Sequence, residues 1–163
     1  MAKSTASRIL LPLLGLFFLA GIFVWRLSLD PLFISQFMSL RKTSVADTST
    51  LLIHGTKITA VIADTEALRM AGLSGRASLP DGEGLLMKFS ADTLPGIWMK
   101  DMNFPIDVVW IDSNWTITQV TPLLRPESYP KVFYPDAPVR FVLEIPASFS
   151  DIHNIKAGDT IER

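Results

Sequence analysis

A stretch of 17 residues, 9–25, carries no charged side chain and is built mainly from Leu, Phe, Ile, Val, Ala and Gly. Its length lies at the lower end of what crosses a hydrocarbon core of roughly 30 Å. Lys3 and Arg8 precede it, and positive residues favour the cytoplasmic side of a membrane. The sequence therefore predicts a cytoplasmic tail over 1–8, a transmembrane anchor over 9–25, and the remaining chain on the outer (periplasmic or extracellular) face.

A cleaved signal peptide is the alternative for the same stretch. A signal peptidase site needs small residues after the apolar run, whereas this run ends in the bulky sequence Ile22-Phe23-Val24-Trp25. An uncleaved single-pass anchor, with Trp25 at the outer interface, is the favoured interpretation. The sequence leaves open whether the anchor is cut.

Residues 26–50 are predicted to connect the anchor to a globular domain. Leu and Phe residues with few charges over 26–40, and Pro31 after Asp30, are typical of a short amphipathic helix at the membrane surface. A helix packed on the domain fits the same pattern. The small polar residues of 41–50 indicate a linker.

Residues 51–163 are predicted to form one mainly β (β-rich α+β) domain. Apolar alternation or short apolar runs predict strands over 58–63, 85–89, 97–99, 105–111, 116–121, 139–145 and 159–162. One short helix is expected to begin after Asp64 as N-cap and to end at Gly72. Short strands at this spacing favour a compact barrel- or sandwich-like domain over a βαβ arrangement.

Charge and missing motifs exclude several functions. Residues 51–163 hold ten Lys and Arg against fourteen Asp and Glu, which argues against nucleic acid as a partner. The chain has no cysteine, so thiol catalysis, zinc–thiolate sites and disulfides are excluded. His54 and His153 have no ligand spacing around them, and no nucleotide-binding motif is present. Neither a metal nor a cofactor is predicted.

Several blocks of the domain resemble one protein family, catalogued as domain of unknown function 192. They are Ala63-Asp64-Thr65, Gly72-Leu73-Ser74-Gly75-Arg76, Leu79-Pro80, Gly84-Leu85-Leu86, Trp98-Met99-Lys100, Pro105-Ile106-Asp107, Ile111-Asp112, Val142-Leu143-Glu144 and Ile155-Lys156-Ala157-Gly158-Asp159. The resemblance covers residues 57–162 and implies a small, mostly β domain, often exported or membrane-anchored, with no reaction or ligand attached to it. The chain departs from the usual pattern of the family at Ser74, Met87 and Asp101-Met102.

Trp98 and Lys100 are the first candidates for a ligand site. Trp98 could stack on a ring or a sugar face, and Lys100 could pair with an anionic group. The alternative is structural: Trp98 fills the core, and Lys100 extends along it or pairs with a carboxylate.

Asp107, Glu144 and Arg76 are the other candidates. Asp107 and Glu144 lie among apolar residues of predicted strands, where a carboxylate needs a partner or a shifted pKa. Structural pairs would be Asp107 with Arg76 or Lys100, and Glu144 with Arg140. The loop 72–76 could hold an anion through backbone N–H groups and Arg76, although a tight structural turn is favoured.

Three functions are consistent with these features. The favoured one is a non-catalytic module that binds a small ligand, a glycan or an envelope protein through the loops around 98–102 and the Pro-rich segment 122–138. The second is a hydrolase that uses Asp107 or Glu144 with Lys100. The third is a structural subunit of an envelope complex, which contacts its partners through 9–25 and 26–40.

Overall fold

The computed structural model describes residues 47–163. The predictions of a cytoplasmic tail, an anchor and a juxtamembrane helix fall on residues 1–46 and lie outside the described residues. From residue 47 onward, no helix has both the length and the apolar character needed to cross a membrane.

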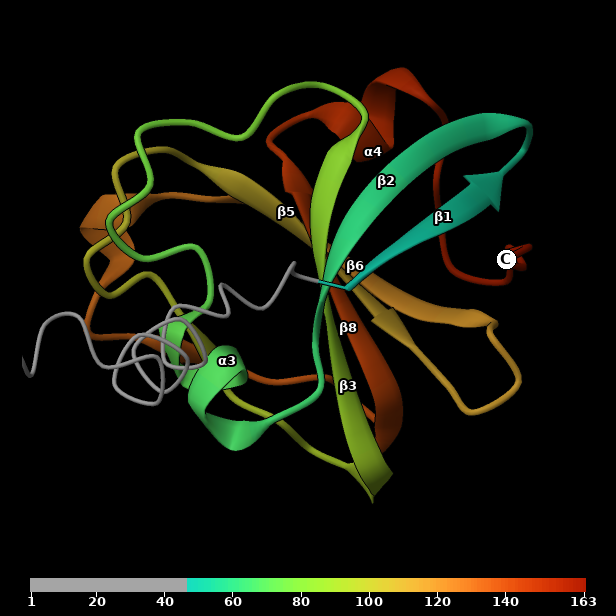
Figure 1. The fold of residues 1–163 in the computed structure, drawn as a ribbon, viewed down its shortest axis with the longest axis horizontal. Coiled ribbons are helices and arrows are strands. Elements are labelled where there is room, and N and C mark those ends of the chain that lie inside the picture. Colours follow the sequence, from blue (N-terminus) through green and yellow to red (C-terminus); the bar gives the residue numbers. More distant parts are fainter. Residues whose placement is uncertain (1–46) are drawn as a thin grey trace, which may run out of the picture. The chain divides into compact units, whose positions relative to one another are not determined.

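Six long strands form one mixed sheet in the order β1-β2-β3-β8-β5-β6 (Figure 1). They are β1 (Thr48–Ile53), β2 (Thr56–Ala63), β3 (Glu83–Thr93), β5 (Ile106–Ile111), β6 (Ile117–Leu124) and β8 (Val139–Pro146). A separate two-stranded sheet pairs β4 (Ile97–Trp98) with β7 (Val132–Phe133). Three short helices complete the domain: α3 (Glu66–Ala71), η2 (Pro126–Ser128) and α4 (Phe149–Ile152). The mainly β α+β class is confirmed.

The connection from β2 to β3 corrects one prediction. β2 and β3 are parallel neighbours, and α3 lies in the crossover between them, so the domain contains a βαβ unit after all. The helix α3 was itself predicted, but its six residues are much shorter than a usual crossover helix, so it did not indicate a parallel connection. The helix begins after Thr65, whose Oγ1 accepts a hydrogen bond from the Leu68 N–H at 3.2 Å, and not after Asp64. Gly72 ends it, as predicted.

Three other segments differ from the prediction. The strand β1 was missed, and its first residues Thr48, Ser49 and Thr50 pair with β2 although they are polar enough to resemble a linker. α4 was missed because it is four residues long. Residues 159–162 do not form a strand but make two isolated bridges, from Thr160 to Thr116 and from Glu162 to Leu52.

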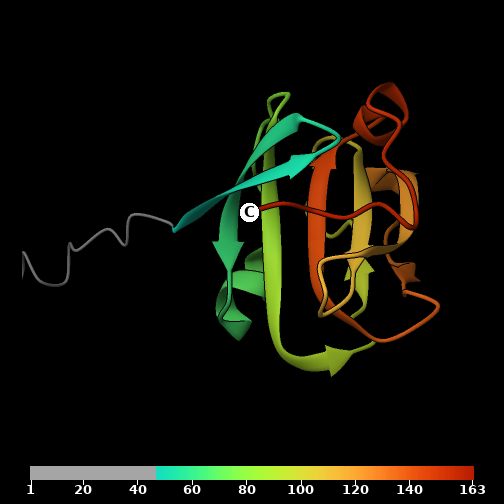
Figure 2. The same ribbon diagram turned by 90° about the vertical axis from the view of Figure 1, so that its right-hand side faces the viewer.

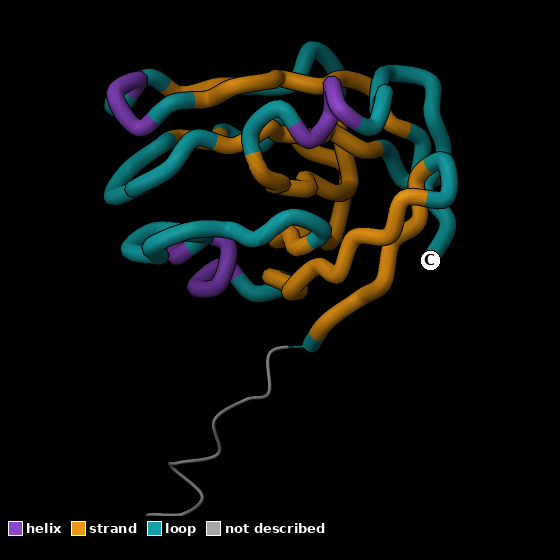
Figure 3. Tube along the Cα trace, turned by 90° about the horizontal axis from the view of Figure 1, so that it is seen from above, coloured by secondary structure: helices purple, strands orange, loops and turns teal. Residues whose placement is uncertain are grey.

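The segment 158–162 links the two edges of the main sheet. Glu162 exchanges backbone hydrogen bonds of 2.8 and 2.9 Å with Leu52 in the edge strand β1. The same segment bonds to the start of the other edge strand, since Ile117 donates to Asp159 and Gly158 donates to Ile117, both at 2.8 Å. Figure 2 shows this segment returning across the domain toward β1. The curvature of the strands, visible in Figure 3, brings the edges within reach of one short segment.

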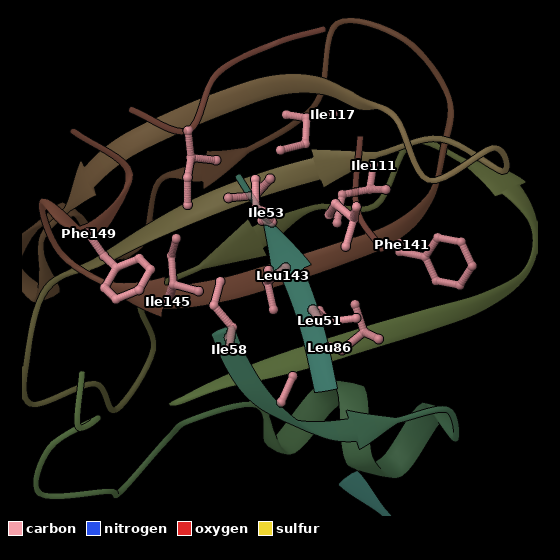
Figure 4. Packing of buried hydrophobic residues seen from close by; sticks show 14 residues of the cluster. Leu51, Ile53, Ile58, Leu86, Ile111, Ile117, Phe141, Leu143, Ile145 and Phe149 are labelled. Atoms are coloured by element: carbon pink, nitrogen blue, oxygen red, sulfur yellow. The ribbon is translucent and has the colours of Figure 1, made fainter. Parts of the chain in front are cut away.

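Apolar residues are buried on both faces of the sheet. Leu143 and Ile145 of β8 belong to one cluster with Leu51, Ile58 and Phe149 (Figure 4). The other cluster takes alternate residues of the same strands and extends to the turn after α3 and to β4; its buried members are Ala63, Leu73, Leu79, Leu85, Met87, Ile97, Met99, Ile106, Val108, Trp110, Leu124, Val139 and Val142. On β5 and β8, Asp107 and Glu144 are therefore both buried, although they are polar.

Candidate functional site

Asp107 is fully buried on β5 and is saturated with hydrogen bonds. Its Oδ1 accepts from the N–H groups of Leu123 at 2.8 Å and Ser148 at 3.1 Å. Its Oδ2 accepts from the N–H and the Oγ of Ser150, at 3.0 and 2.6 Å. The predicted ion pair with Arg76 or Lys100 is wrong. Backbone N–H groups meet the need of the carboxylate, as they commonly do for buried carboxylates.

The hydrogen bonds that Asp107 accepts stabilise two residues with an unusual backbone conformation. Leu123 and Ser148 have φ angles of 56° and 67°, in the left-handed region that residues other than glycine rarely adopt. Both donate their N–H groups to the same oxygen of Asp107. The carboxylate thereby fixes the end of β6 and the start of α4 against β5, which is a structural role.

Glu144 is the second buried carboxyl group, with an exposed fraction of 4%. In β8 it lies opposite Leu85 of β3 and Val108 of β5. Its Oε2 is buried and has no hydrogen-bond partner among residues 47–163. Burial raises the pKa of Glu144 from 4.5 to about 7, and the positive charge of Arg76 opposes this rise. The predicted partner Arg140 bonds instead to Asp92, with Nε and Oδ1 2.8 Å apart.

The two buried carboxylates are on adjacent strands but on opposite faces of the sheet. Asp107 pairs in register with Ile145, and Val108 pairs with Glu144. Because side chains alternate along a strand, Asp107 shares the face of Ile145, and Glu144 shares the face of Val108 and Val142. They cannot work as a catalytic carboxylate pair.

A cavity of about 360 Å³ opens on the face of Glu144. Its walls come from α3 and the turn that follows it, from β3, and from residues 95–98, which include β4. Most of the lining is apolar, and Glu144 is the one buried carboxyl group in it: Glu66, Arg69, Met70, Ala71, Gly72, Leu73, Ser74, Met87, Phe89, Pro95, Gly96, Ile97, Trp98, Met102, Ile106 and Glu144. This is the candidate functional site.

Trp98 lies at this cavity with an exposed fraction of 40%. It is placed by the pairing of β4 with β7, in which Trp98 is opposite Val132 of the Pro-rich segment. Gly96 permits the close approach, because a Cβ there would lie 2.6 Å from a methyl group of Val132 and 2.9 Å from the Tyr134 ring. The structure thus brings together two regions predicted to bind a ligand, 98–102 and 122–138.

Lys100 and Arg76 do not line the cavity, and their loops are joined to each other. Ser74 donates through Oγ to the Lys100 carbonyl, the Gly75 N–H donates to Asp101, and Asn103 donates to the Arg76 carbonyl, each at 2.8 Å. The N–H groups of Ser74 and Arg76 donate to Ala71 and Leu73. Because these N–H groups are engaged, loop 72–76 is a structural turn and offers no anion site built from them.

Sequence reasoning identified Trp98 and Glu144 but not the cavity that joins them. The methionines Met70, Met87 and Met102 line it and gave no signal of their own, because methionines are common in cores. One signal was present. Ser74, Met87 and Met102, where the chain departs from the family pattern, all line the cavity.

The described residues contain no cluster of three His, Asp or Glu side chains that could hold a metal ion. The His54 Nε2 instead lies 3.1 Å from the Asp159 Oδ1. A carboxyl group with a pKa near 7 can both donate and accept a proton at neutral pH. The cavity is therefore suited to hold an apolar molecule against one proton-exchanging group.

Replacing Asp107 by Ala is expected to lower the free energy of unfolding by at least about 3 kcal/mol, because three buried or half-buried N–H groups lose their acceptor. Urea unfolding measures the difference. The control is Asp92→Ala, which breaks an exposed pair and should cost less than about 1 kcal/mol. Equal losses in both variants would remove the structural role of Asp107.

Replacing Glu144 by Gln is expected to change how stability depends on pH. The native state keeps a proton up to a pKa of about 7 that the unfolded chain loses near 4.5. Stability should therefore be greatest below about pH 5 and fall by up to about 3 kcal/mol as the pH rises through 7. Glu144→Gln should remove this fall, whereas the exposed control Glu66→Gln should retain it. Urea unfolding at several pH values measures the free energy of unfolding of each protein. A wild-type free energy of unfolding that stays constant from pH 5 to 8 would contradict the prediction.

Comparisons with known proteins agree with the fold. A protein from Sinorhizobium meliloti 1021, described as a "putative transcription regulator", is 26% identical over 69% of this chain and 89% of its own, with a TM-score of 0.65. A protein of unknown function from Novosphingobium aromaticivorans DSM 12444 is 22% identical over 74% of this chain and 89% of its own, with a TM-score of 0.68. No curated protein matches. Residues 49–163 match the family of uncharacterised proteins DUF192, and the chain belongs to this family.

Proposed function

We propose that this chain is a membrane-anchored protein whose domain lies on the outer face and is a non-catalytic module that binds a small, mainly apolar ligand. The observation that carries the proposal is the cavity of about 360 Å³ beside α3, with its apolar lining and the single buried carboxyl group of Glu144. Small-molecule sites are typically hollows of roughly 300–1,000 Å³ with few polar groups, which fix the orientation of the ligand.

The position of Trp98 supports the same proposal. An indole that is 40% exposed beside an apolar hollow leaves unburied surface that a ligand would cover. Met70, exposed to 58%, lies at the same cavity. Flexible methionines adapt to ligands of different shape.

The membrane and charge features complete the proposal. The apolar stretch 9–25 after Lys3 and Arg8 favours an anchor with the domain outside. Although the similar protein from Sinorhizobium meliloti is described as a regulator of transcription, the acidic excess of residues 51–163 here opposes binding to nucleic acid.

A hydrolase is the second candidate function, and it now depends on Glu144 alone. Asp107 is engaged by four hydrogen bonds on the other face of the sheet, and Lys100 does not line the cavity. A carboxyl group with a pKa near 7 would suit a general acid or base. The third function, a structural subunit of an envelope complex, rests on residues 9–25 and 26–40.

The full-length chain in detergent micelles should bind 2-phenylethanol, a neutral apolar probe small enough for the cavity. At about ten times its dissociation constant, the probe should add roughly 1.4 kcal/mol of stability and raise the unfolding midpoint. The rise should be lost in Trp98→Ala and kept in Ile152→Ala, which truncates an exposed apolar residue of α4 outside the cavity. An equal rise in all three proteins would mean binding elsewhere.

A reporter enzyme that is active only outside the cytoplasm, fused after Arg163 through a flexible linker, should be active. Charge at the start of the anchor sets this orientation, so replacing Lys3 and Arg8 by Glu should reduce the activity. The same reporter fused after Arg8 should be inactive. Activity of this second fusion, or inactivity of the first, would contradict the proposed topology.

A further inference from the structure

The buried carboxyl group of Glu144 lacks the hydrogen-bond donors that the protein gives to its other buried carboxyl group, Asp107. Its Oε2 makes no hydrogen bond within residues 47–163, although Asp107, on the adjacent strand, receives four. A buried polar atom left without a partner costs free energy, so native proteins rarely keep one without a reason. Glu144 lines the cavity, so a ligand there can supply the missing donor.

The lining of the cavity holds two carboxyl groups and one guanidinium, and neither carboxyl group is in an ion pair within residues 47–163. Arg69 lines the cavity, but its guanidinium donates to the carbonyls of Asp64 and Lys88 and lies over the Phe89 ring, 5.0 Å from the centroid. Arg76 acts on Glu144 from outside the lining. Glu66 adds a second carboxylate to the wall. The lining therefore favours a positive group more than a negative one.

The apolar part of the lining suits the same kind of ligand. Trp98 presents an exposed indole, which can cover the apolar body of a ligand. Met87 and Met102 offer polarizable surface for the body of the ligand. The unpartnered Oε2 of Glu144 beside this apolar wall suits an organic ammonium ion, whose N–H groups can make charge-assisted hydrogen bonds to it.

We infer that the ligand of this cavity is an apolar molecule with a protonated amine, whose N–H groups donate to Glu144 and whose apolar body contacts Trp98. This inference rests on the proposed function and specifies its ligand class. An anionic ligand would meet Glu144 and Glu66, and a neutral alcohol would supply a donor without neutralising the carboxylate.

The inference fixes the sign of a pH effect. With its pKa near 7, Glu144 is mostly protonated at pH 6, so an ammonium ion must displace this proton when it binds. Binding then releases up to one proton at pH 6, and affinity rises about tenfold between pH 6 and 8. Arg76, Arg69 and Glu66 are the charged groups that face Glu144 or share its cavity. A neutral ligand does not require Glu144 to lose its proton, so its binding need not release a proton at pH 6.

The test compares three probes of similar shape and different charge: 2-phenylethylammonium, 2-phenylethanol and 3-phenylpropionate. Calorimetry on the full-length chain in detergent micelles gives each affinity at pH 6 and pH 8. Repeating the pH 6 titration in buffers of different ionisation enthalpy counts the protons released. Glu144→Gln keeps the shape of the side chain and removes its charge, and Glu66→Gln is the matched control at the same cavity. Thermal unfolding checks that both variants are folded.

We expect the ammonium probe to bind at least about tenfold more tightly than the alcohol at pH 8, and to release a proton at pH 6. Both effects should vanish in Glu144→Gln and remain in Glu66→Gln. Equal affinity for alcohol and ammonium would overturn the ligand class and leave the proposed function standing. If 3-phenylpropionate binds most tightly of the three probes at pH 6, the ligand class is a carboxylic acid and the inferred amine is wrong. If no probe binds the folded wild type, the inference and the proposed function fail together.

Discussion

The hydrogen bonds to Asp107 are the constraint on which the arrangement of the domain depends. One carboxylate on β5, next to the edge strand β6, joins three segments: β5 itself, the end of β6 through the Leu123 N–H, and the start of α4 through Ser148 and Ser150. It also stabilises two left-handed backbone positions there. With that corner fixed, β5 and β8 keep the register that places Glu144 on the opposite face.

The two buried carboxylates differ because their surroundings differ. Asp107 is shorter and faces backbone N–H groups at a turn, so its charge is solvated by the fold. Glu144 lies between strands whose neighbouring residues, Leu85 and Val108, have apolar side chains. Burial without donors raises the pKa of Glu144 to about 7, so its neutral and ionised forms are both populated near neutral pH. The same sheet therefore holds one structural carboxylate and one that is available for a ligand.

The sequence was sufficient for the mainly β class, for most of the strands, for the helix end at Gly72, and for Trp98 and Glu144 as residues of interest. It could not show the parallel pairing of β2 and β3, because α3, although predicted, is only six residues long and does not resemble a usual crossover helix. The sequence also indicated the wrong ion-pair partners for Asp107 and Glu144. From the sequence alone, an oppositely charged residue is the natural partner for a buried carboxylate. Asp107 is instead bound by backbone N–H groups from residues 123–150, and Glu144 faces a mostly apolar cavity. Neither environment can be recognised before the fold is known.

The link between the sheet edges has a consequence for the order of folding. Residues 158–162 are synthesised last within the domain, yet they bond to Leu52 in its first strand. This contact closes a loop of nearly the whole domain, and such non-local contacts form slowly. Until it forms, β1 has an exposed edge, and a nascent chain with an open strand edge is prone to associate with others. The bridge between the two edges of the sheet can therefore form only after residues 158–162 have been synthesised.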